Sequence, residues 1–198
     1  MKALQNNFIM KKKLVFNNKP NPSRIIDGKK IWFGRSPSVI CAIIVRECPV
    51  PGHSIDYILI SRRGKGSPDH IGKWNLVCGY LDWHENATNG CYREVWEETG
   101  LDLKELIETE YVLSNHMDQP FYVNTDPSEN NENVGLRHGV HIRVESIEDF
   151  IKKNPLTWEN SEPNEVDGYA WITLDEVEDY EFAFNHDDVI RYYVDMVN

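Results

Sequence analysis

Four glutamates, one aspartate and one arginine lie within residues 79–101, GYLDWHENATNGCYREVWEETGL. If residues 86–99 form a helix, Glu94 and Glu98 share one face and Glu97 lies beside Glu98. Like charges at this spacing destabilise a helix by about 0.2–0.5 kcal/mol per pair, and the C-terminal end of the helix dipole disfavours anions. Three carboxylates in this position suit a hard divalent cation, since Mg²⁺ prefers oxygen ligands. The alternative is an acidic helix face that is only solvated.

The helix that carries these acids is predicted by an apolar stripe and by its end. Ala87, Cys91 and Val95 recur every four residues and should face a sheet. Gly100 is a suitable residue for the C-terminal cap. Gly90 costs about 1 kcal/mol relative to Ala inside a helix, which indicates close packing of the helix backbone against a strand.

The rest of the chain alternates strands with helical segments. Residues 38–45, SVICAIIV, form a continuous apolar run that is typical of a central strand covered on both faces and that the polar stretch ECPVPGHS ends. Residues 117–133 have the composition of a long polar loop, and residues 146–155 fit either a short helix or an extended connection. Further strands are expected at residues 56–63, 73–81, 108–116 and 134–144, a strand with a helical turn at 168–180, and a closing helix at 185–197. This order predicts a mixed sheet packed between helices.

The acidic stretch also resembles a known family motif. Gly79, five residues, Glu85, seven residues and then REVWEETGL match the Nudix box G-x5-E-x7-R-E-U-x-E-E-x-G-U, where U is aliphatic, at every specified position. The preceding GKWNL and the later YAWITLDEV are similar to the segments that flank the box in this family, so the resemblance extends from about residue 36 onward. The local departure is Val77-Cys78, where the family usually has Pro-Gly.

The resemblance implies a Nudix-type α/β/α sandwich and a hydrolase that depends on Mg²⁺ or Mn²⁺. Such an enzyme cleaves the pyrophosphate of a nucleoside diphosphate linked to another moiety, and cations neutralise the charge that develops on the pyrophosphate. Arg93 is placed to bridge Glu97 or to reach back to Glu85, and with Gly100 these residues would maintain the geometry of the box. The implied catalytic metal ligands are Glu94, Glu97 and Glu98, with the carbonyl of Gly79 as a further ligand.

Family members commonly take one more carboxylate, as base or ligand, from a loop outside the box. The candidates are Glu129, Glu132, Glu162 and Glu165. The resemblance favours Glu165 and then Glu162, because a glutamate precedes the late Trp-bearing strand in the family; the alternative is that these acids are simply solvated. Arg62 and Arg63 end a predicted strand, and either could bind a substrate phosphate or form a surface salt bridge.

The substrate is indicated only by a short segment. FAFNHDDVI, residues 182–190, resembles a Phe-Asp-His segment of ADP-ribose-hydrolysing members, with Asn185 in place of the Asp. Asn185 is equally a good helix N-cap. Dinucleoside polyphosphates, nucleoside triphosphates and capped RNA remain alternative substrates. A non-catalytic, nucleotide-sensing regulator is the alternative from another class, although the complete box argues against it.

Composition limits the partners and the compartment. The net charge of −11 argues against broad binding to nucleic-acid phosphates. No segment is apolar enough to span a membrane, and four cysteines without a C-x-x-C pair indicate reduced thiols, so a cytoplasmic protein is expected. Residues 1–35 form a predicted N-terminal arm with a hairpin that turns at Asp27-Gly28, and residues 36–198 form the Nudix domain. A homodimer is compatible with such an arm.

Overall fold

The computed structural model describes residues 22–50, 52–126, 133–157 and 164–198. The chain divides into two compact units, Met1–Gly34 and Arg35–Asn198. In the first unit, β1 (Ser23–Ile26) and β2 (Lys29–Trp32) form an antiparallel hairpin. Asp27 and Gly28 turn the chain with φ angles of 49° and 75°, as a two-residue hairpin turn requires.

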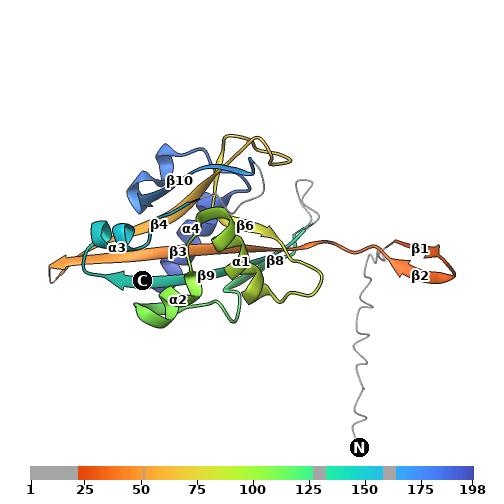
Figure 1. Ribbon diagram of the computed structural model, residues 1–198, viewed down its shortest axis with the longest axis horizontal. Helices are drawn as coiled ribbons and strands as arrows, with labels where there is room; N and C mark the ends of the chain where they lie inside the picture. Colours follow the sequence, from red (N-terminus) through yellow and green to blue (C-terminus); the bar gives the residue numbers. More distant parts are fainter. Residues whose placement is uncertain (1–21, 51, 127–132, 158–163) are drawn as a thin grey trace, which may run out of the picture. The chain divides into compact units, whose positions relative to one another are not determined.

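A mixed sheet forms the centre of the second unit (Figure 1). Its main strand order is β10-β4-β3-β9-β7, in which β3 pairs with β9 in parallel and with β4 in antiparallel orientation. The first residues of β3 pair with β6, and its later residues pair with β4. Strand β8 pairs with the start of β9. The strand bounds are β3 Pro37–Val50, β4 His53–Arg63, β5 Trp74–Asn75, β6 Val77–Tyr80, β7 Tyr111–Asn115, β8 Tyr122–Asn124, β9 Val134–Val144 and β10 Val166–Thr173.

Both faces of this sheet are covered by helices. Successive side chains of β3 point to opposite faces, so Cys41 and Ile43 pack on the side of α1, whereas Ala42 and Ile44 pack on the side of α4. The helices on the first side are α1 Ala87–Thr99, α2 Leu103–Thr109 and α3 Ile147–Lys153, and those on the second are the 3-10 helix η2 Leu174–Asp179 and α4 His186–Val197. The predicted α/β/α sandwich with a mixed sheet is therefore confirmed.

Several boundaries differ from the sequence-based expectation. Strand β3 continues to Val50 and turns directly into β4, because residues 46–50 pair with that strand. The expected strand at 73–81 is two short strands, since β5 pairs with β4 and β6 with β3. Helix α2 was not predicted, and β8 lies inside the expected loop. Residues 146–155 contain helix α3, whose first turn is capped by the Ser146 side chain.

The expectation for Asn185 was wrong in one respect. This residue precedes α4, but its backbone is left-handed, with a φ of 54°, and its side chain makes no capping hydrogen bond. The ring of the next residue, His186, instead accepts a hydrogen bond from the Leu76 N–H. In the described part of the chain, no helix is long and apolar enough to cross a membrane, and the four cysteines are free thiols.

Candidate metal and phosphate site

Helix α1 begins and ends as its sequence predicts. The Asn86 side chain accepts a hydrogen bond from the Asn89 N–H at 2.9 Å. At the other end, Gly100 adopts a φ of 70°, and its N–H donates to the Trp96 carbonyl. Cys91 and Val95 are fully buried in the core beneath the helix. These contacts fix the rotation of the helix, and therefore the direction of every acid on it.

The loop of the box packs tightly against α1 at Gly90. A Cβ atom on Gly90 would lie 2.5 Å from Leu81 Cδ2 and 3.1 Å from Glu85 Oε2. The close neighbour of this glycine is thus the loop between β6 and α1, and the expectation of a strand was wrong. Within the loop, the Asp82 N–H donates to Glu85 Oε2 at 3.2 Å. Trp83 projects away and is 93% exposed.

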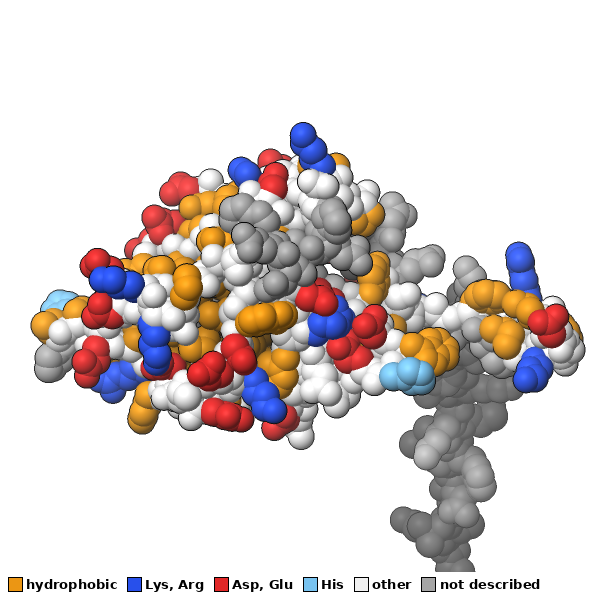
Figure 2. Space-filling view, in the orientation of Figure 1, with side chains coloured by type: hydrophobic (Ala, Val, Ile, Leu, Met, Phe, Trp, Pro, Cys, Tyr) orange, Lys and Arg blue, Asp and Glu red, His pale blue; other side chains and the backbone are white. Residues whose placement is uncertain are grey.

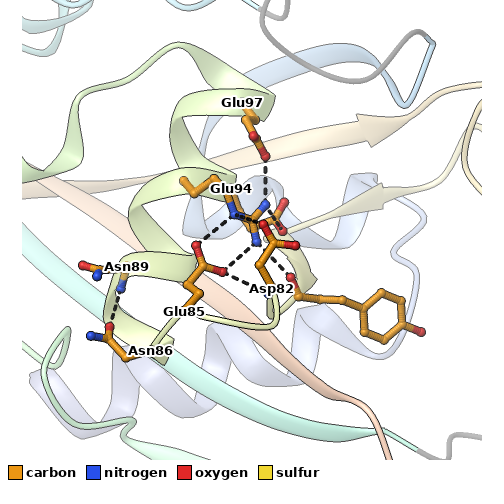
Figure 3. A network of polar contacts seen from close by, with 8 residues as sticks. Asp82, Glu85, Asn86, Asn89, Glu94 and Glu97 are labelled. Atoms are coloured by element: carbon orange, nitrogen blue, oxygen red, sulfur yellow. Dashed lines mark hydrogen bonds and ion pairs between the residues drawn. The ribbon is translucent and has the colours of Figure 1, made fainter.

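Arg93 connects this loop to the acids of the helix (Figure 3). Its guanidinium contacts both carboxylate oxygens of Glu85, with Nε–Oε1 at 3.0 Å and Nη2–Oε2 at 2.9 Å. Nη1 donates to Glu94 Oε1 at 2.8 Å and to Glu97 Oε2 at 2.9 Å, and Nη2 donates to the Tyr80 carbonyl at 2.9 Å. One arginine therefore contacts three of the four glutamates of the box.

The fourth glutamate, Glu98, points into the protein instead. It is only 6% exposed, and its carboxylate accepts hydrogen bonds from Ser61 Oγ at 2.8 Å and from the Cys78 N–H at 3.2 Å. Burial, together with the nearby charges of Glu94 and Glu165, raises the pKa of Glu98 to about 8, although the hydrogen bonds from Ser61 and Cys78 oppose the shift. Among the described residues, no basic side chain pairs with this carboxylate. It is a buried acid without a counterion.

Glu94 lies next to it, above Gly79. A Cβ atom on Gly79 would stand 2.1 Å from Glu94 Oε1, so the carboxylate occupies the space that a larger residue would take. Burial raises the pKa of Glu94 to about 7 although Arg93 opposes the shift, and the charges of Glu97 and Glu165 contribute. The Glu165 carboxylate is thus close enough to act on both Glu94 and Glu98.

Glu165 is positioned by the loop that follows β4. Its carbonyl accepts hydrogen bonds from the Gly64 N–H at 2.7 Å and from Ser67 Oγ at 3.0 Å. A Cβ atom on Gly64 would lie 2.2 Å from the Asn164 carbonyl oxygen, so the two loops touch at that point. Glu162, Glu129 and Glu132, the other candidates for an additional carboxylate, lie outside the described residues.

The two arginines at the end of β4 have different surroundings. Arg62 Nε forms an exposed ion pair with Asp167 Oδ1 at 2.6 Å. Arg63 is mostly buried, pairs with Asp69 at 2.8 Å and lies 4.9 Å above the ring of Phe184. Its charge also acts on Cys78, the residue whose N–H binds Glu98. Of the two, Arg63 is the more buried one.

These donors fit a hard cation in kind, since all are carboxylate or carbonyl oxygens. In their present arrangement, no three acidic, His or Cys side chains of the described residues surround a common metal position. The reason is visible in the hydrogen bonds, because Glu94 and Glu97 turn to Arg93 while Glu98 turns to Ser61. Two neighbouring carboxylates with raised pKa values, the buried Glu98 and the partly buried Glu94, nevertheless mark a place that would be stabilised by added positive charge.

Three contributors to the site lie outside the pattern that the motif provides: the Ser61 hydroxyl, the Cys78 N–H and the Tyr80 carbonyl. For Ser61 there was a signal, since this hydroxyl directly follows the apolar residues Ile58, Leu59 and Ile60 in the buried part of β4. The two backbone groups have no side-chain signature. Their roles depend on how β6 lies against α1.

The surroundings of the site are acidic with scattered basic residues. On the face that carries α1, Figure 2 shows red and blue side chains interspersed, with no continuous basic area among the described residues. Nucleic-acid backbones bind to clustered Lys and Arg. This face therefore lacks the charge pattern of a general nucleic-acid-binding surface.

Fold, box geometry and sequence together define the class of protein. A family profile for the NUDIX domain matches residues 35–193, which is most of the chain. The chain therefore belongs to the Nudix family. No curated protein sequence matches it.

Solved structures with similar folds include proteins of different activity. The NUDIX domain of Shewanella oneidensis NrtR, in complex with ADP ribose, superposes with a TM-score of 0.55 at 13% identity, covering 84% of this chain and 90% of that chain. A bifunctional NMN adenylyltransferase/ADP ribose pyrophosphatase from Francisella tularensis, in complex with AMP and a Mn ion, gives 0.58 at 16%, covering 83% and 42%. An Ap4A hydrolase from C. elegans gives 0.54 at 11%, covering 82% and 97%. At these identities the similarity concerns the fold.

Proposed function

We propose that this chain is a divalent-metal-dependent hydrolase that cleaves the pyrophosphate of a nucleoside diphosphate linked to another moiety, with ADP-ribose as the first candidate substrate. The observation that carries the proposal is Glu98, a buried carboxylate without a counterion that lies beside the partly buried Glu94. Keeping such charges in a protein interior is costly unless something compensates them. A bound Mg²⁺ or Mn²⁺ would do so.

The ligands would be Glu94, Glu97, Glu98 and the carbonyl of Gly79. When bound, the cation would supply Lewis-acid stabilisation of the charge that develops on the pyrophosphate. Arg93 keeps the carboxylates of Glu94 and Glu97 close together before the cation arrives, through its contacts at 2.8 and 2.9 Å. Glu85 in turn holds Arg93, and the Gly100 cap supports the end of the helix.

Two further residues would bind the substrate phosphate and act as the general base. Glu165 is the candidate general base, because its charge acts on both Glu94 and Glu98 while its backbone is anchored to Gly64. Arg63 would bind a substrate phosphate, whereas the exposed pair with Asp167 directs Arg62 elsewhere. Glu162 remains the alternative carboxylate.

The proposal is tested by a product screen with Mg²⁺, with Mn²⁺ and with EDTA. ADP-ribose, diadenosine polyphosphates, nucleoside triphosphates, capped RNA and sugar nucleotides would be offered separately, and products would be identified by mass spectrometry. Formation of AMP and ribose 5-phosphate from ADP-ribose, abolished by EDTA, would support the substrate and the chemistry together. Turnover that persists in EDTA would contradict the metal requirement.

A nucleotide sensor is the second candidate, because the NrtR domain bound to ADP ribose has the same fold. A sensor would bind one nucleotide tightly and turn over none of the panel. The complete box, with all of its glutamates present, favours the enzyme.

A further inference from the structure

A half-buried arginine lies on the other face of the sheet, away from the box helix. Arg137 belongs to β9, and its guanidinium lies 4.9 Å from the ring of Tyr122 on β8. Within the described part of the chain it has no ion-pair or hydrogen-bond partner, whereas Arg46, Arg62 and Arg63 each pair with an aspartate. Burial lowers the pKa of Arg137. This guanidinium is partly shielded from water and has no carboxylate of the described residues within ion-pair distance.

Helix α4 covers the sheet around Arg137 only in part, on the side where its Tyr192 ring lies 5.7 Å from the ring of Tyr122. Helix α4 starts at His186, which binds Leu76, places Tyr193 over Gly139, and ends where Asn198 contacts Arg46. It therefore covers the sheet from the level of Arg137 toward the far ends of β3 and β9. The strand residues before that level remain partly exposed.

These residues form what we call the open strip: Ser38, Tyr80, Tyr122, Asn124, Gly135 and Arg137. They share the α4 side of the sheet because paired residues point to the same face and Ser38 lies two residues before Ile40, which packs on that side. Tyr80 is 57% exposed and Tyr122 is 42% exposed.

The chemistry of the open strip suits a flat, uncharged ring. Its floor is Ile40 together with Gly135, which has no side chain. On one side, the Tyr80 hydroxyl accepts a hydrogen bond from Asn133 Nδ2 at 3.0 Å, so that ring reaches across the start of β3. On the other side lies Arg137 above Tyr122, with free N–H donors. The charge of Asp188 also acts on Arg137, and this acid disfavours a phosphate there.

The open strip is connected to the acids by strand pairing. Arg137 pairs with Ile40, and Ile40 pairs with Cys78, whose N–H binds Glu98. Two strand spacings separate the Cα atoms of Arg137 and Cys78, or about 10 Å. The acids lie on the α1 side of β6 and the open strip on the α4 side, so a nucleoside with its phosphate at the acids would reach the open strip around the edge of β6 that does not pair with β3. Tyr80 belongs to both sites, because its side chain is part of the open strip and its carbonyl accepts a hydrogen bond from Arg93.

We propose that the open strip binds the nucleobase of the substrate and that Arg137 donates hydrogen bonds to ring acceptor atoms of a purine. Arginine donors pair with such acceptors in nucleic-acid recognition, and exposed tyrosine rings stack on bases. The proposal rests on the proposed function for its substrate class. It names Arg137 as a residue that contacts the base.

The test measures equilibrium binding of AMP, GMP and ribose 5-phosphate in Mg²⁺ by calorimetry, using the full chain. AMP and ribose 5-phosphate share a phosphate and a ribose and differ in the base. We expect Arg137→Met to weaken binding of AMP or GMP about tenfold and to leave ribose 5-phosphate unchanged. Arg143→Met is the matched control, because Arg143 is an exposed arginine on the same strand; it should change neither.

Equal losses for AMP and ribose 5-phosphate would overturn the proposal, because Arg137 would then bind phosphate. Unchanged AMP and GMP binding in Arg137→Met, or no binding of either nucleotide to the wild-type protein, would overturn it as well. If Arg137→Met does not fold, amide chemical shifts of the wild-type protein decide: AMP should move the Gly135 and Tyr122 resonances, and ribose 5-phosphate should not. Failure of hydrolysis with base-dependent binding intact would contradict only the proposed function.

Discussion

The Glu94 carboxylate stands where the first side-chain atom of any residue other than glycine at position 79 would stand. The ideal Cβ position on Gly79 is 2.1 Å from Glu94 Oε1 and 2.3 Å from its carboxyl carbon. Strand β6 and helix α1 therefore meet at a point where β6 has no side chain and α1 carries a carboxylate. This contact brings the Gly79 backbone next to a carboxylate of the proposed metal site.

Gly79→Ala should displace that carboxylate. The added methyl group cannot be accommodated without moving Glu94, because atoms do not approach within 2.1 Å. We expect metal-dependent hydrolysis to fall by at least about tenfold and the free energy of unfolding to fall by about 1–3 kcal/mol. Gly168→Ala is the control, since its nearest neighbour would be at an ordinary 3.5 Å. Equal activities of the two variants would contradict the prediction.

Arg93→Lys should weaken the connection between loop and helix. A single ammonium group cannot reproduce the forked contact with Glu85 while also contacting Glu94 and Glu97. Urea unfolding should show a loss of about 2 kcal/mol, the scale of a few charge-assisted hydrogen bonds. Arg62→Lys should cost less than about 1 kcal/mol, because its pair with Asp167 is exposed. A loss at Arg62 that matches the loss at Arg93 would argue against a special role for the network.

Glu98→Gln should separate folding from metal binding. The amide keeps the shape, its oxygen can accept from the Cys78 N–H while its NH2 donates to Ser61 Oγ, and a buried charge is removed, so the metal-free variant should unfold at the wild-type temperature or above it. The rise in melting temperature that Mn²⁺ causes in the wild type should shrink markedly, since a ligand stabilises only the state that binds it. Hydrolysis should be lost.

Glu105→Gln is the matched control for this experiment, because Glu105 is an exposed glutamate on α2. It should retain both the activity and the shift in melting temperature. A full Mn²⁺ shift in Glu98→Gln would remove Glu98 from the ligand set.

His186 should make the protein less stable in acid. Burial lowers its pKa from 6.5 to about 3, and the charges of Arg137 and Arg63 act in the same direction. Between these two values the unfolded chain binds more protons than the folded one, so stability falls as the pH drops from about 6.5 toward 3, by at most about 1.4 kcal/mol per pH unit.

His186→Asn should remove this contribution, because the amide oxygen can still accept from Leu76 but does not titrate. The difference in unfolding free energy between wild type and variant, measured by urea titration at several pH values, should narrow or change sign as the pH falls. Because other acids affect both proteins alike, only the difference is informative. Parallel curves would show that His186 is protonated at the same pH in both states.

Much of the site was accessible from the sequence because its parts are near neighbours along one helix. Helical geometry places Glu94, Glu97 and Glu98 within one turn, and Arg93 one turn from Glu97. The apolar stripe and the glycine cap of α1 were predicted for the same reason, as was the central strand. The errors concern the ends of strands and short elements such as α2, whose formation depends on packing partners that lie elsewhere in the chain.

The sequence by itself therefore determined the box, the helix that carries it and the mixed sheet beneath, since these follow from local periodicity and from spacing over a few residues. Only the tertiary structure decided that Ser61, 37 residues away, would bind Glu98, that Arg62 would pair with Asp167 and Arg63 with Asp69, and that Arg137 would have no ion-pair partner among the described residues. Strand register decides such contacts, because a shift by one residue moves every side chain to the opposite face of the sheet.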